Sequence, residues 1–368
     1  MIDRRLIQNF DWFLLLFAVS IAAVGIVSLY SAVYQAHSGT GQGAVYNKQI
    51  FWLGAGVLAL IVMMIPDYRT FERFAYPIYW LCVALLVAVL FVGTIAKGSQ
   101  RWLALGPITI QPSELVKLAV VIALARYFHR NRPAGGYGLL DLVRPLVIIG
   151  IPFLLVLKQP DLGTALLVVL IGGTALLFVN VRLKSVLTMA GVGLATVFAA
   201  WEYLLRDYQR MRVKTFLDPE MDPLNSGYQA IQSKIAVGSG GFFGKGFLHG
   251  TQTQLNFLPE QQTDFIFSVT AEEWGFLGAG LVLLLYLVLI LYILNVARSS
   301  KDGFGALVGA GIAGMLFWPV FVNVGMVLGF LPVVGVPLPL MSYGGSSLVV
   351  TFAALGLLMN IRMRRFTF

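Results

Sequence analysis

Cysteine is almost absent from this sequence: Cys82 is the only one, and it lies inside an apolar run. A single cysteine excludes an intramolecular disulfide, a metal cluster built on thiolates and a C-x-x-C redox pair. Histidine is nearly as scarce, because only His37, His129 and His249 occur, far apart in the sequence. The sequence therefore offers neither a histidine metal triad nor a Ser-His-Asp relay.

Charged residues are also few. They make up 12% of the 368 residues, whereas 58% are apolar. Soluble globular domains carry about 25% charged residues, so the composition indicates an integral membrane protein. The first apolar run, residues 12–34, is too long for a signal-peptide core and has no small-x-small cleavage site behind it, so we expect a retained span. The net charge of +9 resides mostly in short loops, where it reports topology and gives no reason to expect a nucleic-acid partner.

Ten apolar runs are long enough to cross a membrane as helices. The sequence therefore predicts an all-α, polytopic membrane protein whose two termini lie on one side. The fourth and fifth runs are the least regular, because they are short and carry Lys117 and Pro152. The predicted spans are residues 12–34, 49–65, 75–96, 113–128, 143–157, 162–181, 186–205, 265–297, 304–330 and 345–361.

Basic residues in the short loops are distributed unevenly between the two sides. The sparse side has only Lys48, Lys97, Arg101 and Lys158. By the positive-inside rule both termini are then cytoplasmic, and residues 206–264 form a large extracytoplasmic loop between the seventh and eighth helices. Its turn signals and glycines predict short helices and turns packed on a single membrane domain, residues 1–368, in which we find no internal repeat. The rich side holds Arg4, Arg5, Arg69, Arg73, Arg126, Arg130, Arg132, Arg144, Arg182, Lys184, Arg298, Lys301, Arg362, Arg364 and Arg365.

Polar residues at two outward helix starts are candidates for a site. In "IQPSELVK", Glu114 and Lys117 lie on one helix face, and the carboxylate suits a helix N-terminus. A capping and a functional interpretation of Glu114 both stay open, but Lys117 lies inside an apolar helix and needs a carboxylate or an anionic ligand. In "KQPDLGTA", capping is the favoured interpretation of Asp161, and a pocket role stays open.

A basic cluster occurs in the long loop. "YQRMRVKTF" places Arg210, Arg212 and Lys214 at alternate positions, which would align them on one side of an extended segment. They form either a solvated face or a site for a pyrophosphate, which arginine suits.

Two glycine-rich stretches resemble known motifs only in part. "GSGGFFGKG" lacks the spacing of an ATP-binding P-loop, so its glycines are expected to serve tight turns and close backbone approach. "LPLMSYGGSS" lacks G-x-S-x-G, and Ser342 and Ser346 are expected to satisfy backbone groups of a broken helix.

Acids cluster around the start of the eighth span. Asp264 follows Pro259 and Thr263 beside the basic loop and the glycine turn, and we favour a functional role over a cap. Glu272 and Glu273 lie deeper, so at least one is expected to face a polar cavity or pair internally.

Taken together, these stretches resemble the SEDS family (shape, elongation, division, sporulation), and the elongation type more than the division type. The likeness runs in order through nearly the whole chain. One departure is Gln262, where relatives commonly carry His, so a base role moves toward Asp264. The matching stretches are "GSQRWLALG", "QPSELVKLA", "KQPDLGTA", "DPLNSGYQAIQSKIAVGSGG", "FLPEQQTDFIF", "EEWGFLG" and "GVPLPLMSYGGSS".

The resemblance implies an inverting glycosyltransferase of the bacterial inner membrane that polymerises lipid II into peptidoglycan for cell elongation and releases undecaprenyl pyrophosphate. Such a reaction needs one general base and charge stabilisation of the pyrophosphate, for which a divalent cation, Mg²⁺ or Mn²⁺, is expected. The expected partners are the undecaprenyl pyrophosphate-linked glycan, a class B penicillin-binding protein and other elongation-complex membrane proteins. Asp264 is the implied catalytic residue and cation ligand, and the implied substrate-binding residues are Arg101, Glu114, Lys117, Asp161, Arg210, Arg212, Lys214, Gln232, Ser233, Glu260, Thr263 and Ser342.

Two rival functions differ in class. A lipid-precursor flippase or secondary transporter predicts charges in both halves of the bundle and inverted repeats, whereas the charges here gather on the outer side. A purely structural scaffold leaves the buried Lys117 and Asp264 unexplained.

Overall fold

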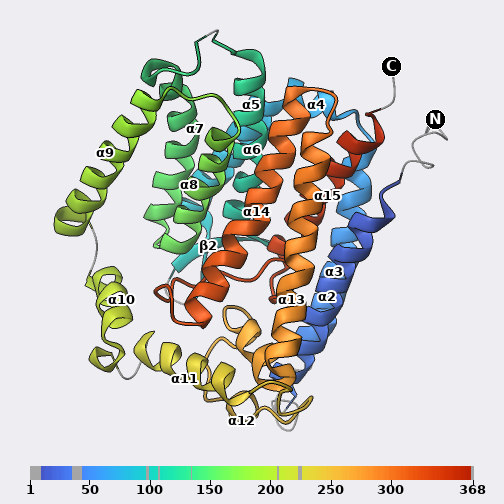
Figure 1. The fold of residues 1–368 in the computed structure, drawn as a ribbon, viewed down its shortest axis with the longest axis vertical. Helices are drawn as coiled ribbons and strands as arrows, with labels where there is room; N and C mark the ends of the chain where they lie inside the picture. Colours follow the sequence, from blue (N-terminus) through green and yellow to red (C-terminus); the bar gives the residue numbers. More distant parts are fainter. Residues whose placement is uncertain are drawn as a thin grey trace.

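The computed structural model describes residues 10–34, 44–96, 99–106, 108–133, 135–204, 207–222 and 226–365. Long helices form a bundle (Figure 1). They are α2 (Trp12–Val33), α3 (Ala44–Met64), α5 (Ala75–Val92), α6 (Pro112–Arg130), α7 (Leu139–Lys158), α8 (Leu162–Leu177), α9 (Leu183–Ala199), α13 (Ile266–Arg298), α14 (Gly303–Val327) and α15 (Gly345–Met363).

Each predicted span corresponds to one of these helices. Eight helices in the described ranges are long and apolar enough to cross a membrane, which makes the chain a multi-pass membrane protein. The other two are α8, which is apolar but shorter, and α6, which carries Glu114, Lys117 and Arg126. Both lie within the bundle beside the longer helices (Figure 1).

The centre of the bundle is formed by α6, α14 and α15, whose side chains are mostly buried. Small residues allow the close contacts: Gly356 of α15 lies against the main chain of Leu60 in α3, and Gly25 of α2 lies against Met341. By contrast, α9 buries only Ser185 along its length. Its apolar surface is therefore left to face lipid.

The basic residues used to predict a cytoplasmic side gather at one end of the bundle where the structure describes them; Arg4 and Arg5 lie outside the described residues. There lie the short helix α4 (Tyr68–Arg73), the end of α6 and the starts of α7 and α9 (Figure 1). The opposite end, called the outer end below, carries α10 (Asp207–Leu217), α11 (Ser226–Ser239) and α12 (Thr251–Gln254) (Figure 1). A π-helical turn, Ala200–Leu204, continues α9, and a 3-10 turn, Pro219–Met221, precedes α11.

Short helices and turns occur in the described residues between α9 and α13. α11 packs on α13 and α14, and α12 packs on α2 and α13. The expectation of an extended basic segment is wrong, because Arg210, Arg212 and Lys214 lie in helix α10. Residues two apart on a helix are separated by about 200°, so Arg212 faces away from the other two.

A small antiparallel sheet between α5 and α6 was not predicted. β1 (Thr94–Ala96) pairs with β2 (Ser99–Leu105), and β2 pairs with β3 (Ile108–Ile110). The sheet places Arg101 at the outer end, beside the start of α8.

Candidate functional site

The turn before α13, residues 260–265, is held by three hydrogen bonds to consecutive carbonyl oxygens. The Tyr343 N–H donates to Gln262 at 3.0 Å, the Ser342 hydroxyl donates to Thr263 at 2.5 Å, and the Asn323 side-chain amide donates to Asp264 at 2.8 Å. The donors come from α14 and from the segment after it, residues 328–344. The main chain at Asp264 is therefore fixed by elements far away in sequence.

The carboxyl group of Asp264 is half-buried and lies against the backbone of residues 328–344. A side chain on Gly335, whose φ is +71°, would come within 3.2 Å of Asp264 Oδ2. The N-cap position of α13 is Phe265 rather than Asp264. Glu260 has a φ of +54°, which is uncommon for a residue other than glycine, and its carbonyl oxygen accepts the N–H groups of Thr263 and Asp264 at 3.1 Å.

The same segment connects this turn to the start of α8. A side chain on Gly163 would lie 2.6 Å from the carbonyl oxygen of Val334, so α8 and the segment touch through bare backbone. The predicted cap is confirmed: Asp161 is the N-cap of α8 and accepts the N–H of Thr164 at 3.1 Å. Arg101 forms an ion pair with Asp161 at 3.3 Å and donates to the carbonyl oxygen of Pro160 at 2.6 Å. Asp161 and Arg101 thus form one unit beside the Asp264 turn.

Glu114 and Lys117 form a buried ion pair in the first turns of α6. Their charged atoms are 2.9 Å apart, and the side chains are less than one-tenth exposed. Lys117 therefore has the carboxylate partner that the sequence required. The start of α6 also contacts α15, because the Ser346 hydroxyl accepts the N–H of Gln111 at 3.1 Å.

The hydroxyls of the broken segment satisfy backbone groups, as predicted. Ser342 accepts the N–H of Leu338 at 2.8 Å, in addition to donating to Thr263. Ser233 has a related role in α11: it is fully buried, contacts the hydroxyl of Ser268 at 3.0 Å and donates to the carbonyl oxygen of Val327 at 2.9 Å. Its neighbour Gln232 is half-buried.

The three basic residues of α10 have different surroundings. Arg212 lines a pocket of about 400 Å³, together with Asp222, Ser226, Gln229 and Val333. Val333 belongs to the segment 328–344, which touches Asp264 through Gly335, so this segment also forms part of the pocket wall. Arg210 instead donates to the carbonyl oxygen of Glu202 at 2.7 Å, and Lys214 is exposed. The structure therefore does not bring the three side chains onto one surface.

Glu272 and Glu273 are buried in α13, and Glu272 pairs internally, as expected of at least one of them. Glu272 forms an ion pair with Lys245 of the glycine-rich loop at 2.8 Å and accepts the N–H groups of Gln252 and Thr253. The helix is interrupted at Gly275, whose φ is +66°. The loop bridges the interruption: Lys245 and Gly246 donate to the carbonyl oxygens of Glu272 and Glu273, while Phe276 and Leu277 donate to those of Gly241 and Phe242. The glycines thus provide the close backbone approach expected of them.

Comparisons with known proteins agree with this architecture. The family model described as "Cell cycle protein", which covers FtsW, RodA and SpoVE proteins, matches residues 11–366. The chain belongs to this family. It is the SEDS family that the motifs resemble.

Individual relatives point to the elongation type. Peptidoglycan glycosyltransferase MrdB of Escherichia coli K12 is 47% identical over 89% of this chain and 88% of its own length. Peptidoglycan glycosyltransferase RodA of Treponema pallidum is 33% identical over 98% of this chain and 99% of its own length.

Two solved structures share the fold over 98% of this SEDS chain. One, described as "Structural coordination of polymerization and crosslinking by a peptidoglycan synthase complex", is 36% identical with a TM-score of 0.84 over 99% of that chain. The other, the Rod shape determining protein RodA of Thermus thermophilus, is 31% identical with a TM-score of 0.71 over 98% of that chain.

Sequence reasoning missed the residues that fix the turn of this SEDS protein. Asn323 is fully buried and donates to Val336 at 2.7 Å as well as to Asp264. Gln49 of α3 donates to the carbonyl oxygen of Ser342 at 3.0 Å and accepts the N–H of Gly344 at 3.3 Å. Asn323 is a lone amide in an apolar run, and that isolation was the available signal, whereas Gln49 directly follows Asn47 and Lys48 and carries no such signal.

Proposed function

We propose that this chain polymerises lipid II into glycan strands at the outer face of the bacterial cytoplasmic membrane, with release of undecaprenyl pyrophosphate, for cell elongation and rod shape. The chain is a peptidoglycan glycosyltransferase of the SEDS family, 47% identical to MrdB. The observation that carries the finer proposal is the position of Asp264, a half-buried residue in a turn whose carbonyl oxygens are held by three separate donors at the outer end of the bundle.

In the proposed reaction Asp264 is the general base. It takes the proton from the 4-hydroxyl of the acceptor sugar, and that oxygen attacks the anomeric carbon of the donor with inversion. The bond between the anomeric carbon and the pyrophosphate oxygen breaks at the same time. The pyrophosphate leaves as an anion, so it needs positive charge near it and no proton. Gln262 cannot act as the base, because an amide does not titrate in the physiological range.

The leaving group needs cationic side chains, and three candidates surround the turn. We assign Arg212 to the pyrophosphate, because it lines the pocket beside Val333. Arg101 lies beside the turn but is engaged by Asp161. Lys117 becomes available if an anionic substrate replaces Glu114 as its partner. The remaining proposed substrate contacts are Glu114, Asp161, Arg210, Lys214, Gln232, Ser233, Glu260, Thr263 and Ser342.

A divalent cation fits the donor set near Asp264. In the described part of the chain no group of three or more His, Cys, Asp or Glu side chains could hold a metal ion on its own. Mg²⁺ is commonly bound by one or two carboxylates together with substrate phosphates, and Asp264 with Glu260 nearby meets that requirement. Such an ion, Mg²⁺ or Mn²⁺, would neutralise charge on the departing pyrophosphate.

The proposed partner is a class B penicillin-binding protein that cross-links the product strand, alongside other elongation-complex membrane proteins. Support comes from the similarity to a chain of a peptidoglycan synthase complex. Pull-downs from native membranes should recover such a transpeptidase, and its consistent absence would contradict the proposal.

The proposed orientation places both termini on the cytoplasmic side of the inner membrane. Basic residues concentrated at the α4 end support it. Single cysteines at the exposed positions 220 and 184, in a Cys82→Ala background, test it with a membrane-impermeant thiol reagent. In intact spheroplasts position 220 should react and position 184 should not, and the reverse pattern would overturn the orientation.

The decisive experiment replaces Asp264 by Asn and assays purified protein with lipid II, a divalent cation and, if required, the partner. Loss of a general base should lower polymerisation roughly 10²- to 10⁴-fold. The matched control is Asp218→Asn, because Asp218 only caps the 3-10 turn by accepting the N–H of Glu220 and Asn caps about as well as Asp. The catalytic role fails if Asp264→Asn polymerises lipid II as fast as Asp218→Asn.

A further inference from the structure

A groove lies between α5, α6 and α7 at the α4 end of the bundle, opposite the proposed catalytic turn. Its volume is about 340 Å³. Tyr76, Tyr79 and Trp80 of α5 form an aromatic wall, and Val147 and Ile151 of α7 form an aliphatic one. Trp80 is 56% exposed and Val147 is 50% exposed. Since α5 and α7 are candidate membrane spans, this open side faces lipid.

Two prolines and two tyrosines of the bundle build the groove. Pro145 and Pro152 of α7 have no N–H, so the carbonyl oxygens of Asp141 and Ile148 lose their helical donors. The Tyr127 hydroxyl of α6 donates to Asp141 at 2.6 Å, and the Tyr79 hydroxyl of α5 donates to Ile148 at 3.1 Å. In a membrane such carbonyl groups must be satisfied by neighbouring helices. The hydroxyl bridges therefore fix α7 at the distance that leaves the groove open.

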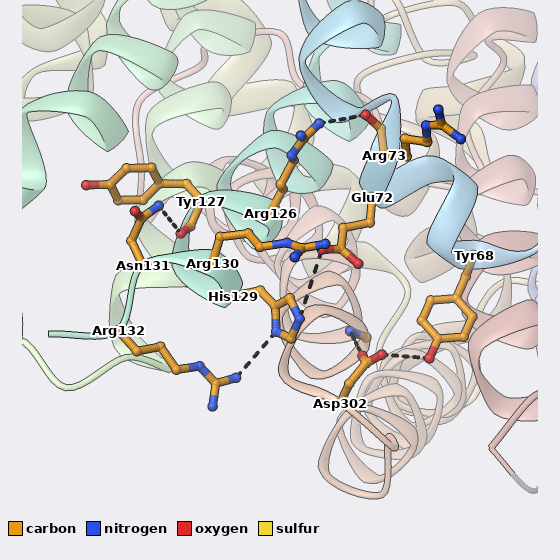
Figure 2. Close-up of polar contacts among 11 residues, drawn as sticks. Tyr68, Glu72, Arg73, Arg126, Tyr127, His129, Arg130, Asn131, Arg132 and Asp302 are labelled. Carbon is orange, nitrogen blue, oxygen red and sulfur yellow. Dashed lines mark hydrogen bonds and ion pairs between the residues drawn. The ribbon is translucent and has the colours of Figure 1, made fainter. Parts of the chain in front are cut away.

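Two guanidinium groups lie at the polar end of the groove. Arg144 lines it directly and, among the described residues, takes part in no ion pair or hydrogen bond. Arg126 lies over the ring of Tyr76, with its Cζ 4.7 Å from the ring centre. One of its nitrogens donates to the main-chain carbonyl of Arg73, as Figure 2 shows. Within the described ranges its other N–H groups have no such acceptor, so they can serve a ligand at the groove mouth.

The nearby carboxylates are engaged elsewhere. Glu72 pairs with Arg130 at 2.7 Å and lies 4.0 Å from His129 (Figure 2). Asp141 accepts the N–H of Gly138 at 2.8 Å. Positive charge at the groove mouth is thus not balanced by an ion pair between these acids and Arg126 or Arg144.

We propose that this groove binds an anionic glycerophospholipid, with the phosphodiester held by Arg126 and Arg144 and one acyl chain along the wall of α5 and α7. Charge complementarity selects the occupant: basic pockets between membrane helices suit anionic head groups, and tyrosine and tryptophan suit the level of the head groups. A lipid whose head group carries a balancing amine would bring positive charge to the two arginines. This site is separate from the glycosyl-transfer chemistry and does not depend on it.

The test compares lipid occupancy by native mass spectrometry of protein released from nanodiscs with equal amounts of phosphatidylglycerol and phosphatidylcholine. The wild-type protein should retain phosphatidylglycerol selectively. Arg126→Gln with Arg144→Gln should lower that retention roughly 25-fold, since each basic residue contributes a factor of about five near an anionic membrane surface. The charge-matched control, Lys184→Gln with Arg298→Gln, removes two exposed basic residues at the same end and should retain the lipid.

A second variant separates the groove from charge alone. Val147→Trp fills the groove from an exposed position and leaves both arginines in place, so it should displace the lipid as well. If the control pair loses as much phosphatidylglycerol as the Arg126 and Arg144 pair, the lipid is held by general surface charge. If Val147→Trp retains as much phosphatidylglycerol as the wild type, the lipid does not bind in the groove. Equal retention of the two lipids by the wild type would overturn the proposal.

Discussion

The side-chain amide of Asn323 donates a hydrogen bond of 2.8 Å to the main-chain carbonyl oxygen of Asp264. The same amide donates to the carbonyl oxygen of Val336 at 2.7 Å, next to Gly335, whose backbone adjoins the Asp264 carboxyl group. One buried side chain of α14 therefore sets both the turn that carries the proposed base and the backbone in front of it.

Asn323→Ala should slow polymerisation by far more than its effect on folding suggests. The change leaves two carbonyl groups unsatisfied, at about 1–3 kcal/mol each, and a displacement near 1 Å at a reacting group lowers a rate on the order of 100-fold. Asn360→Ala is the matched control, because Asn360 is also fully buried and donates to two carbonyl oxygens, those of Met63 and Pro66. Thermal unfolding in detergent and polymerisation of lipid II are measured for both. Equal loss of activity in the two variants would leave Asn323 a purely structural residue.

Variants of the buried pair of Glu114 and Lys117 should show different effects on thermal stability and on polymerisation. Lys117→Met alone leaves a buried carboxylate without its cation, and breaking a buried pair destabilises by about 3–5 kcal/mol. The double variant Glu114→Gln with Lys117→Met removes both charges and should recover most of the thermal stability. We expect it to remain defective in polymerisation, since Lys117 is a proposed substrate contact. A stable double variant with full activity would reduce the pair to a structural role.

Arg212→Gln should raise the KM for lipid II, because Arg212 is assigned to the pyrophosphate and lines the pocket that includes Val333. Loss of one charge-assisted hydrogen bond to the pyrophosphate would raise it roughly tenfold or more. Lys184→Gln removes the same charge from an exposed position at the opposite end of the bundle and should leave KM close to that of the wild type. Steady-state polymerisation at varied lipid II concentration distinguishes the two. Identical KM values for both variants would mean that Arg212 does not bind the pyrophosphate and belongs to a solvated surface.

Gly275→Ala should strongly destabilise the protein. The φ of +66° with ψ of −162° is a conformation found essentially only for glycine and costs another residue about 1–3 kcal/mol, and the added methyl group would collide with the main chain of Gly244. Gly280→Ala is the control in the same helix, where a side chain meets open space and alanine is favoured over glycine by about 0.8–1.0 kcal/mol. Thermal unfolding should show a large loss for the first variant and none for the second. A Gly275→Ala protein as stable as wild type would mean that the interruption relaxes without difficulty.

Hydropathy predicted the helices well, because a membrane span must be apolar and must satisfy its own backbone. Local chemistry also predicted the cap at Asp161 and the backbone role of Ser342. The prediction of an extended basic segment was wrong, since alternation of charged and apolar residues over a few positions is compatible with the helix formed by Asp207–Leu217. The small sheet, with strands of three and seven residues, was too short to be distinguished from a loop.

The positioning of Asp264 lay beyond sequence reasoning for a different reason. Its carbonyl oxygen is bound by Asn323, 59 positions away in the chain, and that of Thr263 by Ser342, 79 positions away. No local pattern encodes such partners, because only the tertiary fold brings them together. The candidate base could be named from its neighbours in sequence, whereas the residues that hold it could not.

The interruption of α13 at Gly275 has a mechanical consequence. The segment from Ile266 to Trp274, which follows Asp264, is hydrogen-bonded to Lys245 and Gly246, and the rest of the helix to Gly241 and Phe242. The loop therefore links the two parts of the helix across the interruption at Gly275. Phe243, which is 77% exposed on that loop, lies between the residues bonded to the two parts, so a force applied to it acts on both parts of the helix, including the part that begins beside Asp264.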